Sequence, residues 1–228
     1  ERALACAIRL LDRGFFRIGS EGYTEQNKSY GLATMLKEHV TLSNGKVIFE
    51  FVGKSGKEQV KSVVDPLVFA TVAALKRRRG GSKELLAYKI GNTWIDVKSI
   101  EINEYLKDVA GDDYSAKDFR TWHATELAAI GLAVSYPTAT SKTARKRAIS
   151  RMVKEVALSL GNTPAVARRS YIDPVVIDKF EHGITIGGTM EMIGDSDPFD
   201  FGTLGVVETA VLDLLRGDKK SVYLDKVA

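Results

Sequence analysis

The chain has 228 residues, of which 44% are hydrophobic, so it can bury the core of one large domain or of two small lobes. A single cysteine, Cys6, excludes an internal disulfide framework and fits a reducing compartment, and no apolar run is long enough to span a membrane. The formal net charge of +4 is carried by clustered Lys and Arg residues, a pattern typical of polyanion-binding surfaces but also of solvated helix faces.

The N-terminal third of the chain predicts two helices followed by a small antiparallel sheet. From the spacing of apolar residues, helices are expected at residues 2–13, with Gly14 at the end, and at residues 28–37. Strands are expected at residues 40–42, 47–52 and 59–64. Asn44-Gly45 lies between the first two strands and favours a type I′ hairpin, because both central residues of that turn need positive φ. The second turn, at residues 53–56, places Lys54 at one tip of the sheet.

The rest of the chain predicts mainly helix. A helix begins at Pro66, a residue well suited to a first helical position, and runs to a basic cluster at residues 76–79. Further helices are expected at residues 97–109, 116–131, 142–160, 164–170, 174–182 and 205–216. Residues 86–90 are expected to be extended, and the Gly/Asp-rich stretch 183–200 to be a loop. The fold class is therefore α+β, mainly α, with a three-stranded antiparallel sheet near the N-terminus.

Two familiar kinds of site are excluded by their spacing. The run Gly53-Lys54-Ser55 resembles a phosphate-binding loop, but Ile48 stands where such a loop requires glycine. What remains there is a lysine on a hairpin tip, which is usually solvated. The histidines, which lack metal-ligand spacing, are His39, His123 and His182. We interpret His123 as a buried or half-buried histidine on a helix face.

Two arginines stand in contexts that call for an anion. Arg17 lies between Phe16 and Ile18 in a run that should be partly buried, so it needs either a structural carboxylate or a substrate phosphate. Arg120 lies near the start of a predicted helix and can point past the N-terminus of that helix, where backbone N–H groups also favour an anion. The alternative for Arg120 is a surface arginine paired with an acidic neighbour, Asp118 or Glu126.

A tyrosine near the end of the helical part has the setting of a nucleophile. Tyr171 follows Asn162 by nine positions and stands just after Arg168 and Arg169. Gly161-Asn162-Thr163-Pro164 is a turn that ends one predicted helix and begins the next. An amide behind the tyrosine and cations beside it suit attack on a phosphate. The alternative is a core tyrosine at a helix end.

Four phrases in this order resemble the catalytic domain of the type IB DNA topoisomerases, in particular the poxvirus-like and bacterial forms. They are Phe15-Phe16-Arg17-Ile18-Gly19, Phe49-Glu50-Phe51-Val52-Gly53-Lys54, Lys117-Asp118-Phe119-Arg120-Thr121-Trp122, and Gly161-Asn162-Thr163-Pro164 with Tyr171 nine residues after the asparagine. The resemblance covers about residues 1–182 and is far more specific than any single phrase.

The resemblance implies a transesterification carried by five residues. Tyr171 attacks a DNA phosphodiester and forms a 3′-phosphotyrosyl bond, releasing a 5′-hydroxyl. Arg17 and Arg120 clamp the non-bridging oxygens, Asn162 adds a hydrogen-bond donor, and Lys54 protonates the leaving oxygen. Supercoil torsion drives strand rotation before religation, so no cofactor, ATP or metal ion is required. The implied partner is double-stranded DNA, acted on by a monomer away from membranes, in the cytoplasm and nucleoid of a bacterial cell.

Two other classes of protein stay open. Tyrosine recombinases share this catalytic domain, but they typically carry His where Lys117 stands and His or Trp where Asn162 stands. Viral and eukaryotic topoisomerases commonly carry His at the Asn162 position, so Asn there resembles the bacterial form. A non-catalytic duplex DNA-binding module is the third class. Lys57 is an alternative to Lys54 as the acid, although the position next to Val52-Gly53 favours Lys54.

The clustered basic residues are candidates for contacts with the DNA backbone. Those expected to bind duplex are Lys117, Arg145, Arg147, Arg151, Arg168 and Arg169. The chain begins at Glu1 in sequence that already looks helical, so we expect further sequence upstream, including an N-terminal clamp domain. Within the catalytic domain, residues 1–80 are expected to carry the sheet, residues 81–183 the helices and the nucleophile, and residues 184–228 a tail.

Overall fold

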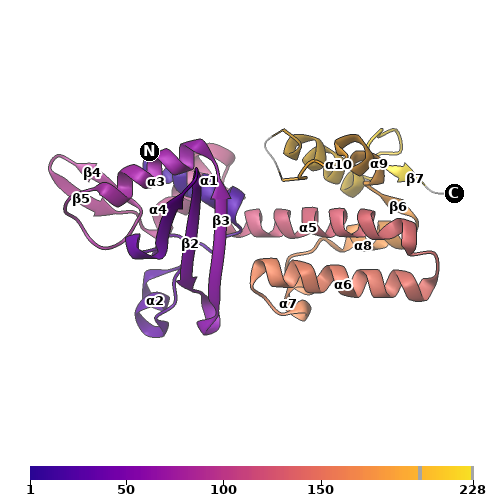
Figure 1. Cartoon of the computed structure of the whole chain (residues 1–228), viewed down its shortest axis with the longest axis horizontal. Helices are drawn as coiled ribbons and strands as arrows, with labels where there is room; N and C mark the ends of the chain where they lie inside the picture. Colours follow the sequence, from indigo (N-terminus) through magenta and orange to yellow (C-terminus); the bar gives the residue numbers. More distant parts are fainter. Residues whose placement is uncertain (200–201, 227–228) are drawn as a thin grey trace. The chain divides into compact units, whose positions relative to one another are not determined.

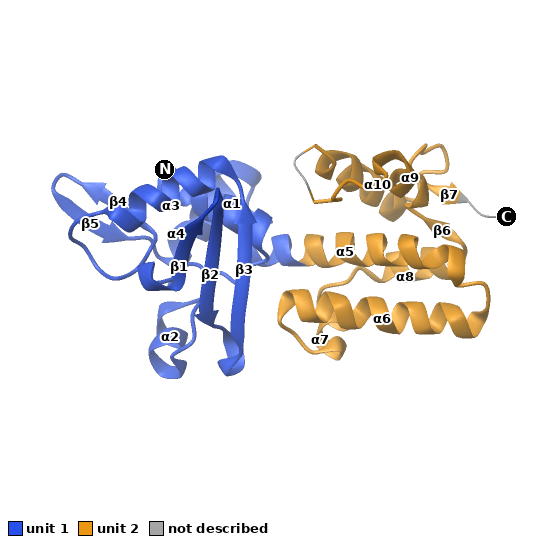
Figure 2. Cartoon of the chain, in the orientation of Figure 1, with its two compact units in different colours: residues 1–120 blue, residues 121–228 orange. Residues whose placement is uncertain are grey.

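The computed structural model describes residues 1–199 and 202–226. The chain forms two compact units, Glu1–Arg120 and Thr121–Ala228, and the boundary falls inside one helix, α5 (Ala116–Ser135) (Figure 2). The mainly helical α+β class is confirmed. In the part of the chain that the structure describes, no helix combines the length and hydropathy needed to cross a membrane.

The helices of unit 1 are labelled in Figure 1, and all but the second of them contribute residues to a hydrophobic core. They are α1 (Arg2–Gly14), α2 (Glu21–Asn27), α3 (Pro66–Arg77) and α4 (Ser99–Ala110), with 3₁₀ turns at Lys37–His39 and Lys54–Gly56. α1 buries Cys6 and Leu10 on its apolar face. α3 begins as its sequence predicts, because the Asp65 carboxylate accepts hydrogen bonds from two backbone N–H groups ahead of it.

The predicted three-stranded sheet is confirmed, with strand order β1-β2-β3 and antiparallel pairing throughout. Its strands are β1 (Val40–Ser43), β2 (Lys46–Val52) and β3 (Glu58–Val64). Asn44 and Gly45 have φ of 47° and 75°, the positive values that the type I′ turn needs. In the register of the central strand, Phe49 stands opposite Val40 on one side and Lys61 on the other.

A second hairpin follows α3. β4 (Ala87–Ile90) confirms the extended segment that the sequence predicts, but its partner β5 (Thr93–Asp96) was not predicted. Trp94 on β5 lies 5.6 Å from the guanidinium of Arg78. Arg78 is buried and donates a hydrogen bond of 2.7 Å to the carbonyl of Leu85, so part of the basic cluster at 76–79 supports the fold instead of lying solvated on a helix face.

The predicted helix at 28–37 is wrong. The helix in this region is α2, at Glu21–Asn27, and the chain beyond it is irregular up to a short 3₁₀ turn. The physical reason is long-range pairing: Leu32 N donates to Arg17 O at 2.9 Å and Ala33 N to Ile18 O at 2.8 Å. Backbone donors used in this way are not available to a helix.

Within the described residues, unit 2 is helical apart from one short strand pair. Its helices after α5 are α6 (Lys142–Leu160), α7 (Pro164–Ser170), α8 (Pro174–Glu181), α9 (Gly187–Ile193) and α10 (Leu204–Arg216), with a 3₁₀ turn at Tyr136–Thr138. The strands β6 (Ile184–Thr185) and β7 (Asp225–Lys226) pair antiparallel. The predicted bounds of α6 and α7 are confirmed, and those of α8 and α10 within one residue.

The expectation of a loop at 183–200 is wrong for much of its length, because β6 and α9 lie within it. Asp200, the last residue of that expected loop, lies outside the described residues, as do positions 201, 227 and 228 of the expected tail. The cause is again non-local. β6 pairs with β7 near the C-terminus, and Thr189 of α9 is fully buried and donates to Tyr223 O at 3.2 Å.

Candidate active site

Arg17 is held in an extended segment that follows a sharp turn. Phe15, just after α1, adopts the left-handed conformation at φ 54°, and the ring of Phe16 then folds back into the core. Gly14 permits this, because a Cβ at that position would overlap the Phe16 ring. The backbone pairing with Leu32 and Ala33 then fixes the path of the segment, and Arg17 is half-buried, as its sequence context predicts.

Lys54 lies in the turn between β2 and β3, where the sequence places it. Gly53 N donates to Lys57 O at 2.7 Å and closes the turn, which leaves Lys54 exposed to solvent. Val52, just before this turn, accepts a hydrogen bond of 2.7 Å from Tyr30 N. The tip of the sheet is therefore tied to the same loop that pairs with the Arg17 segment.

Arg17 and Lys54 line one cavity of about 250 Å³ in unit 1. The lining residues that carry a hydroxyl group are Ser20, Tyr23, Thr24, Ser29 and Tyr30. Its backbone wall depends on two glycines, because a Cβ on Gly19 would stand 2.8 Å from the Cα of Gly31. The structure thus brings together two cations that are far apart in the sequence.

Sequence reasoning missed Ser29, which lines the same cavity. Ser29 is 3% exposed, and its hydroxyl oxygen has no hydrogen-bond partner within residues 1–199 and 202–226. A buried hydroxyl without a partner is costly unless a ligand or water satisfies it. Nothing in its sequence context, Asn27-Lys28-Ser29-Tyr30, distinguishes it from an ordinary loop serine.

Arg120 is buried in unit 1, with 4% of its surface exposed. Its Nη1 donates a hydrogen bond of 2.6 Å to the carbonyl oxygen of Phe15. Because Arg120 is buried, the alternative of a surface arginine paired with Asp118 or Glu126 is wrong. The Asp118 carboxylate accepts from the N–H and hydroxyl of Ser115 and caps the start of α5, and the Glu126 carboxylate lies 2.8 Å from His123 Nδ1. Arg120 therefore approaches the segment that carries Arg17.

Lys61 is a second residue that sequence reasoning missed. It lies on β3 and is half-buried, with its ammonium 5.9 Å and 5.8 Å from the ring centroids of Phe15 and Phe16. Burial, and then the charges of Arg120 and Arg17, lower the pKa of Lys61 to about 8. The period-2 alternation of β3 could have identified it as an inward-facing lysine.

Asn162 and Tyr171 belong to unit 2, at the two ends of α7. Gly161 ends α6 in the left-handed conformation at φ 64°, and Asn162 N donates to Ala157 O at 2.8 Å. Tyr171 caps α7, where its own N–H donates to Ala167 O at 3.1 Å. Both side chains are half-buried.

A buried threonine holds the backbone around Tyr171. Thr125 of α5 is 2% exposed, and its Oγ1 donates to Thr121 O at 2.9 Å and lies 3.4 Å from Tyr171 O. Thr125 Oγ1 also accepts a hydrogen bond of 3.2 Å from Asp173 N. Through Thr125, α5 thus fixes the backbone that directly follows Tyr171. On the same helix, His123 is buried and bonded to Glu126 at 2.8 Å, so the prediction of a buried histidine is confirmed.

The basic residues expected to contact DNA fall into two groups. Arg145 is half-buried and donates to Glu181 O at 2.7 Å while its guanidinium lies 5.6 Å from the Tyr136 ring centroid, which favours a structural role. The exposed members are Lys117, Arg147, Arg151, Arg168 and Arg169. No cluster of three or more His, Cys, Asp or Glu side chains suited to a metal ion occurs within the described ranges.

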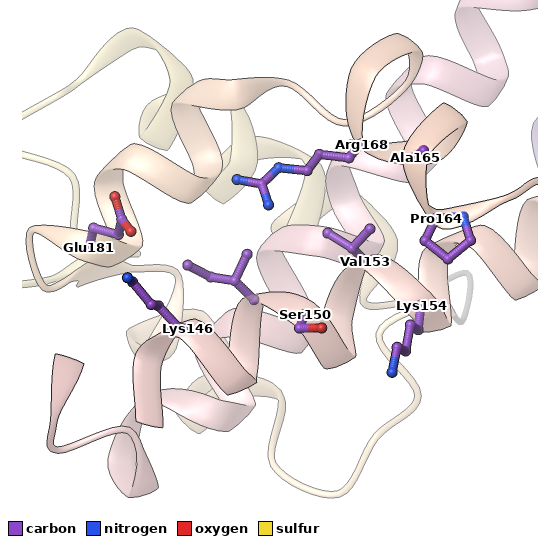
Figure 3. Close-up of a pocket in the computed structure, with 9 residues that line it drawn as sticks. Lys146, Ser150, Val153, Lys154, Pro164, Ala165, Arg168 and Glu181 are labelled. Carbon is purple, nitrogen blue, oxygen red and sulfur yellow. The ribbon is translucent and has the colours of Figure 1, made fainter. Parts of the chain in front are cut away.

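Arg168 lines a groove of about 490 Å³ in unit 2, between α6, the start of α7 and the end of α8. Figure 3 shows Lys146 and Glu181 at one end of this groove, Lys154 and Pro164 at the other, and the guanidinium of Arg168 reaching in between. Ile149 and Val153 complete its apolar floor. The groove thus combines three cations with a single carboxylate.

Comparison with known proteins places the chain in a family. Residues 1–186 match the family described as "Eukaryotic DNA topoisomerase I, catalytic core". The chain is 28% identical over 207 residues to DNA topoisomerase 1B of Acanthamoeba polyphaga mimivirus, covering 88% of this chain and 60% of that protein. It is 25% identical over 186 residues to DNA topoisomerase 1 of rabbit fibroma virus, covering 81% and 56%.

A match to a cellular protein points the same way. The chain is 31% identical over 127 residues to DNA topoisomerase 1 of Schizosaccharomyces pombe, covering 55% of this chain and 15% of that protein. The chain therefore spans about 60% or less of the length of these relatives. Because the family match extends over most of the chain, the protein belongs to the DNA topoisomerase I catalytic-core family.

Proposed function

We propose that this chain carries out the reaction of a type IB DNA topoisomerase, relaxing supercoiled duplex DNA through a transient 3′-phosphotyrosyl bond. The observation that carries the proposal is the gathering of cations in unit 1. Arg17 and Lys54 line one cavity, and Arg120 is bonded to the segment before Arg17. Guanidinium groups in such a setting suit the charge that develops on the non-bridging oxygens of a phosphodiester under attack.

Tyr171 is the proposed nucleophile. Its phenolic oxygen gives up its proton to solvent water and attacks phosphorus, the bond between phosphorus and the 5′-oxygen breaks, and the departing oxygen takes a proton from Lys54. A tyrosine of ordinary pKa near 10 is only about one part in a thousand ionised at pH 7, so attack needs cations that stabilise the developing charge. The proposal requires the Tyr171 hydroxyl to reach the phosphate that the unit 1 cations hold, and Asn162 to add a donor beside it.

The phosphotyrosyl ester conserves the energy of the broken bond. The free 5′-hydroxyl attacks it in the reverse reaction, the tyrosine leaves, and the strand is rejoined. Neither ATP nor a metal ion enters this proposed cycle, since torsion in the DNA supplies the driving force for rotation. Exposed cations, including Arg147, Arg151, Arg169 and those of the unit 2 groove, are proposed to contact the DNA backbone.

A plasmid assay tests the proposal. Supercoiled plasmid is incubated with the chain in EDTA without ATP, beside a Tyr171→Phe variant, and part of each reaction is stopped with detergent. We expect relaxation and a covalent protein–DNA adduct from the parent alone. Equal relaxation by both proteins would remove Tyr171 as the nucleophile. Binding without relaxation would indicate a non-catalytic module, and strand exchange between two defined sites would indicate a recombinase.

A further inference from the structure

Lys61 stands at an unusual place for a lysine, on the inner side of β3. The outward residues of this strand, Val60 and Val64, are 72% and 71% exposed, whereas Val63 on the inner side is 2% exposed. Lys61 shares the side of Val63, because side chains two positions apart point the same way. It also stands opposite Phe49, which is fully buried.

The surroundings of Lys61 hold aromatic rings and cations. Phe15 and Phe16 lie within 6 Å of its ammonium, and Phe49 faces it from β2. The charges that act on it come from Arg17 on the segment after α1 and from Arg120 on α5. Among the described residues, no Asp or Glu forms an ion pair with Lys61.

Such a setting disfavours the protonated lysine unless an anion is present. Two neighbouring cations and partial burial oppose its charge, and they lower its pKa to about 8. The faces of the aromatic rings offset part of this cost. The alternative to an anion site is therefore a structural lysine whose charge is stabilised by these rings alone. A bound phosphate would act in the opposite direction, since an anion beside an ammonium favours the charged form.

We propose that Lys61 is a further cation of the phosphate site formed with Arg17 and Arg120, and that it takes up a proton from solvent when a phosphodiester binds there. The inference rests on the proposed function in one respect, namely that the anion is a DNA phosphate. In the free chain at pH 9, about nine in ten Lys61 side chains are neutral if the pKa is about 8. DNA binding at that pH therefore recruits a proton.

The sign of the pH dependence follows from this linkage. Below pH 7 Lys61 is charged whether DNA is bound or not, so the affinity does not depend on its titration. Above pH 8 only the DNA-bound state keeps the proton, and the affinity falls by up to about tenfold for each further pH unit.

The test is equilibrium binding of a duplex oligonucleotide to the Tyr171→Phe chain, so that cleavage does not intervene. Affinity is measured by fluorescence anisotropy at pH 7, 8 and 9. Calorimetry at pH 8.5 in two buffers of different ionisation enthalpy gives the number of protons taken up. We expect uptake of more than half a proton in this background.

Two substitutions test whether Lys61 is the group that takes up this proton. Lys61→Arg keeps a charge that does not titrate, so uptake and pH dependence should both be lost while binding at pH 7 is retained. Lys61→Met keeps the apolar stem but removes the charge, so binding at pH 7 should weaken severalfold and uptake should again be lost. Lys46→Met is the matched control, because Lys46 is exposed at the far end of the same sheet. Proton uptake that persists in Lys61→Arg overturns the inference.

A direct titration covers the case in which a Lys61 variant does not fold. In ¹³C-lysine-labelled parent chain, the Lys61 resonance should titrate near pH 8 and move to higher pH when the duplex is added. An unchanged midpoint would leave Lys61 as a packing lysine held by aromatic rings. Loss of plasmid relaxation with retained proton uptake would instead overturn the proposed function and leave this anion site standing.

Discussion

Arg120 Nη1 donates a hydrogen bond of 2.6 Å to the carbonyl oxygen of Phe15, two residues before Arg17. This bond joins the second turn of α5 to the segment after α1, so both arginines are oriented by one stretch of backbone. A planar guanidinium can make it and still offer other donors, since it carries five N–H groups in a fixed fork. The anchor and the phosphate clamp can thus be the same side chain.

Arg120→Lys should therefore slow DNA cleavage strongly, by on the order of a hundred-fold or more. The compact ammonium cannot bond the Phe15 carbonyl and clamp a phosphate bidentately together. The measurement is single-turnover cleavage of a duplex whose short 3′ strand dissociates after the cut. Arg216→Lys, an exposed change at the end of α10, is the control and should be nearly neutral. A loss of only a few-fold in Arg120→Lys would place this arginine outside the site.

The close approach of Gly19 and Gly31 makes a second prediction. A Cβ on Gly31 would overlap the Cα of Gly19, and both segments line the cavity of Arg17 and Lys54. We expect Gly31→Ala to lower the free energy of unfolding by about 1–3 kcal/mol, because backbone atoms must move apart.

Urea unfolding measures the stability of Gly31→Ala, and single-turnover cleavage reports whether the cavity is distorted. Gly22→Ala in α2 is the control, since nothing lies within 4 Å of a Cβ there. That change should be neutral or slightly stabilising. Equal stability of the two variants would mean that the backbone crossing relaxes without cost.

Local signals predicted the two helices that lie on either side of Asn162. The bounds of α6 and α7 follow from the Ser141 cap, the left-handed Gly161, the Thr163 cap and Pro164 at the first helical position, all within one turn of each helix end. The segment at 28–37 could not be predicted in this way, because its backbone donors pair with Arg17 and Ile18. α9 depends likewise on contacts with residues near the C-terminus.

The residues of the candidate site divide in the same way into those that local sequence predicted and those that it did not. Arg17, Lys54 and Arg120 stand in recognisable phrases. The structure places Arg17 and Lys54 on one cavity of unit 1 and bonds Arg120 to Phe15, two residues before Arg17. Ser29 and Lys61 stand in no such phrase. Their significance comes from burial, from a shared cavity and from neighbouring charges, which depend on segments that are distant in sequence. The roles of Asn162 and Tyr171 stay predictions for the experiments.

Thr125 supplies a third prediction, because its hydroxyl serves the backbone on both sides of Ile172. Thr125→Val keeps the shape but leaves the Asp173 N–H without its acceptor, so stability should fall by about 1–3 kcal/mol. Cleavage should slow by about tenfold as Tyr171 loses its fixed backbone. Thr125→Ser restores the hydroxyl and should recover most of both. If Thr125→Val cleaves at the parental rate, this hydroxyl does not position the nucleophile.

The role of Lys54 can be tested by changing the leaving group. Lys54→Ala should slow cleavage of an ordinary phosphodiester, because the departing 5′-oxygen then lacks a proton donor. A substrate with sulfur in place of that oxygen needs little protonation, so Lys54→Ala should cleave it at nearly the parental rate. Lys57→Ala, in the same exposed turn, should change neither rate much. If the sulfur substrate instead rescues Lys57→Ala, the proton donor is Lys57 and not Lys54.

The groove of unit 2 gives the last prediction. Lys146 and Lys154 are eight residues apart on α6, which separates them by about 12 Å along the helix axis. Phosphates of one DNA strand recur every 3.4 Å along the duplex axis, so cations at this spacing suit a run of backbone phosphates better than a single anion. Arg168 lies between them, and Glu181 is the carboxylate that opposes such binding.

Removing the cations and removing the carboxylate of the groove should change the affinity for DNA at low salt in opposite directions. Lys154→Ala and Arg168→Ala should each reduce the slope of log affinity against log salt by about 1, because one counterion fewer is released. Glu181→Gln should strengthen binding at low salt, since repulsion of the phosphates is lost. The control is Lys220→Ala, at an exposed lysine outside the groove, which should leave the slope unchanged. If the two groove variants keep the parental slope, DNA does not occupy the groove, and its lysines and arginine are solvated surface charges.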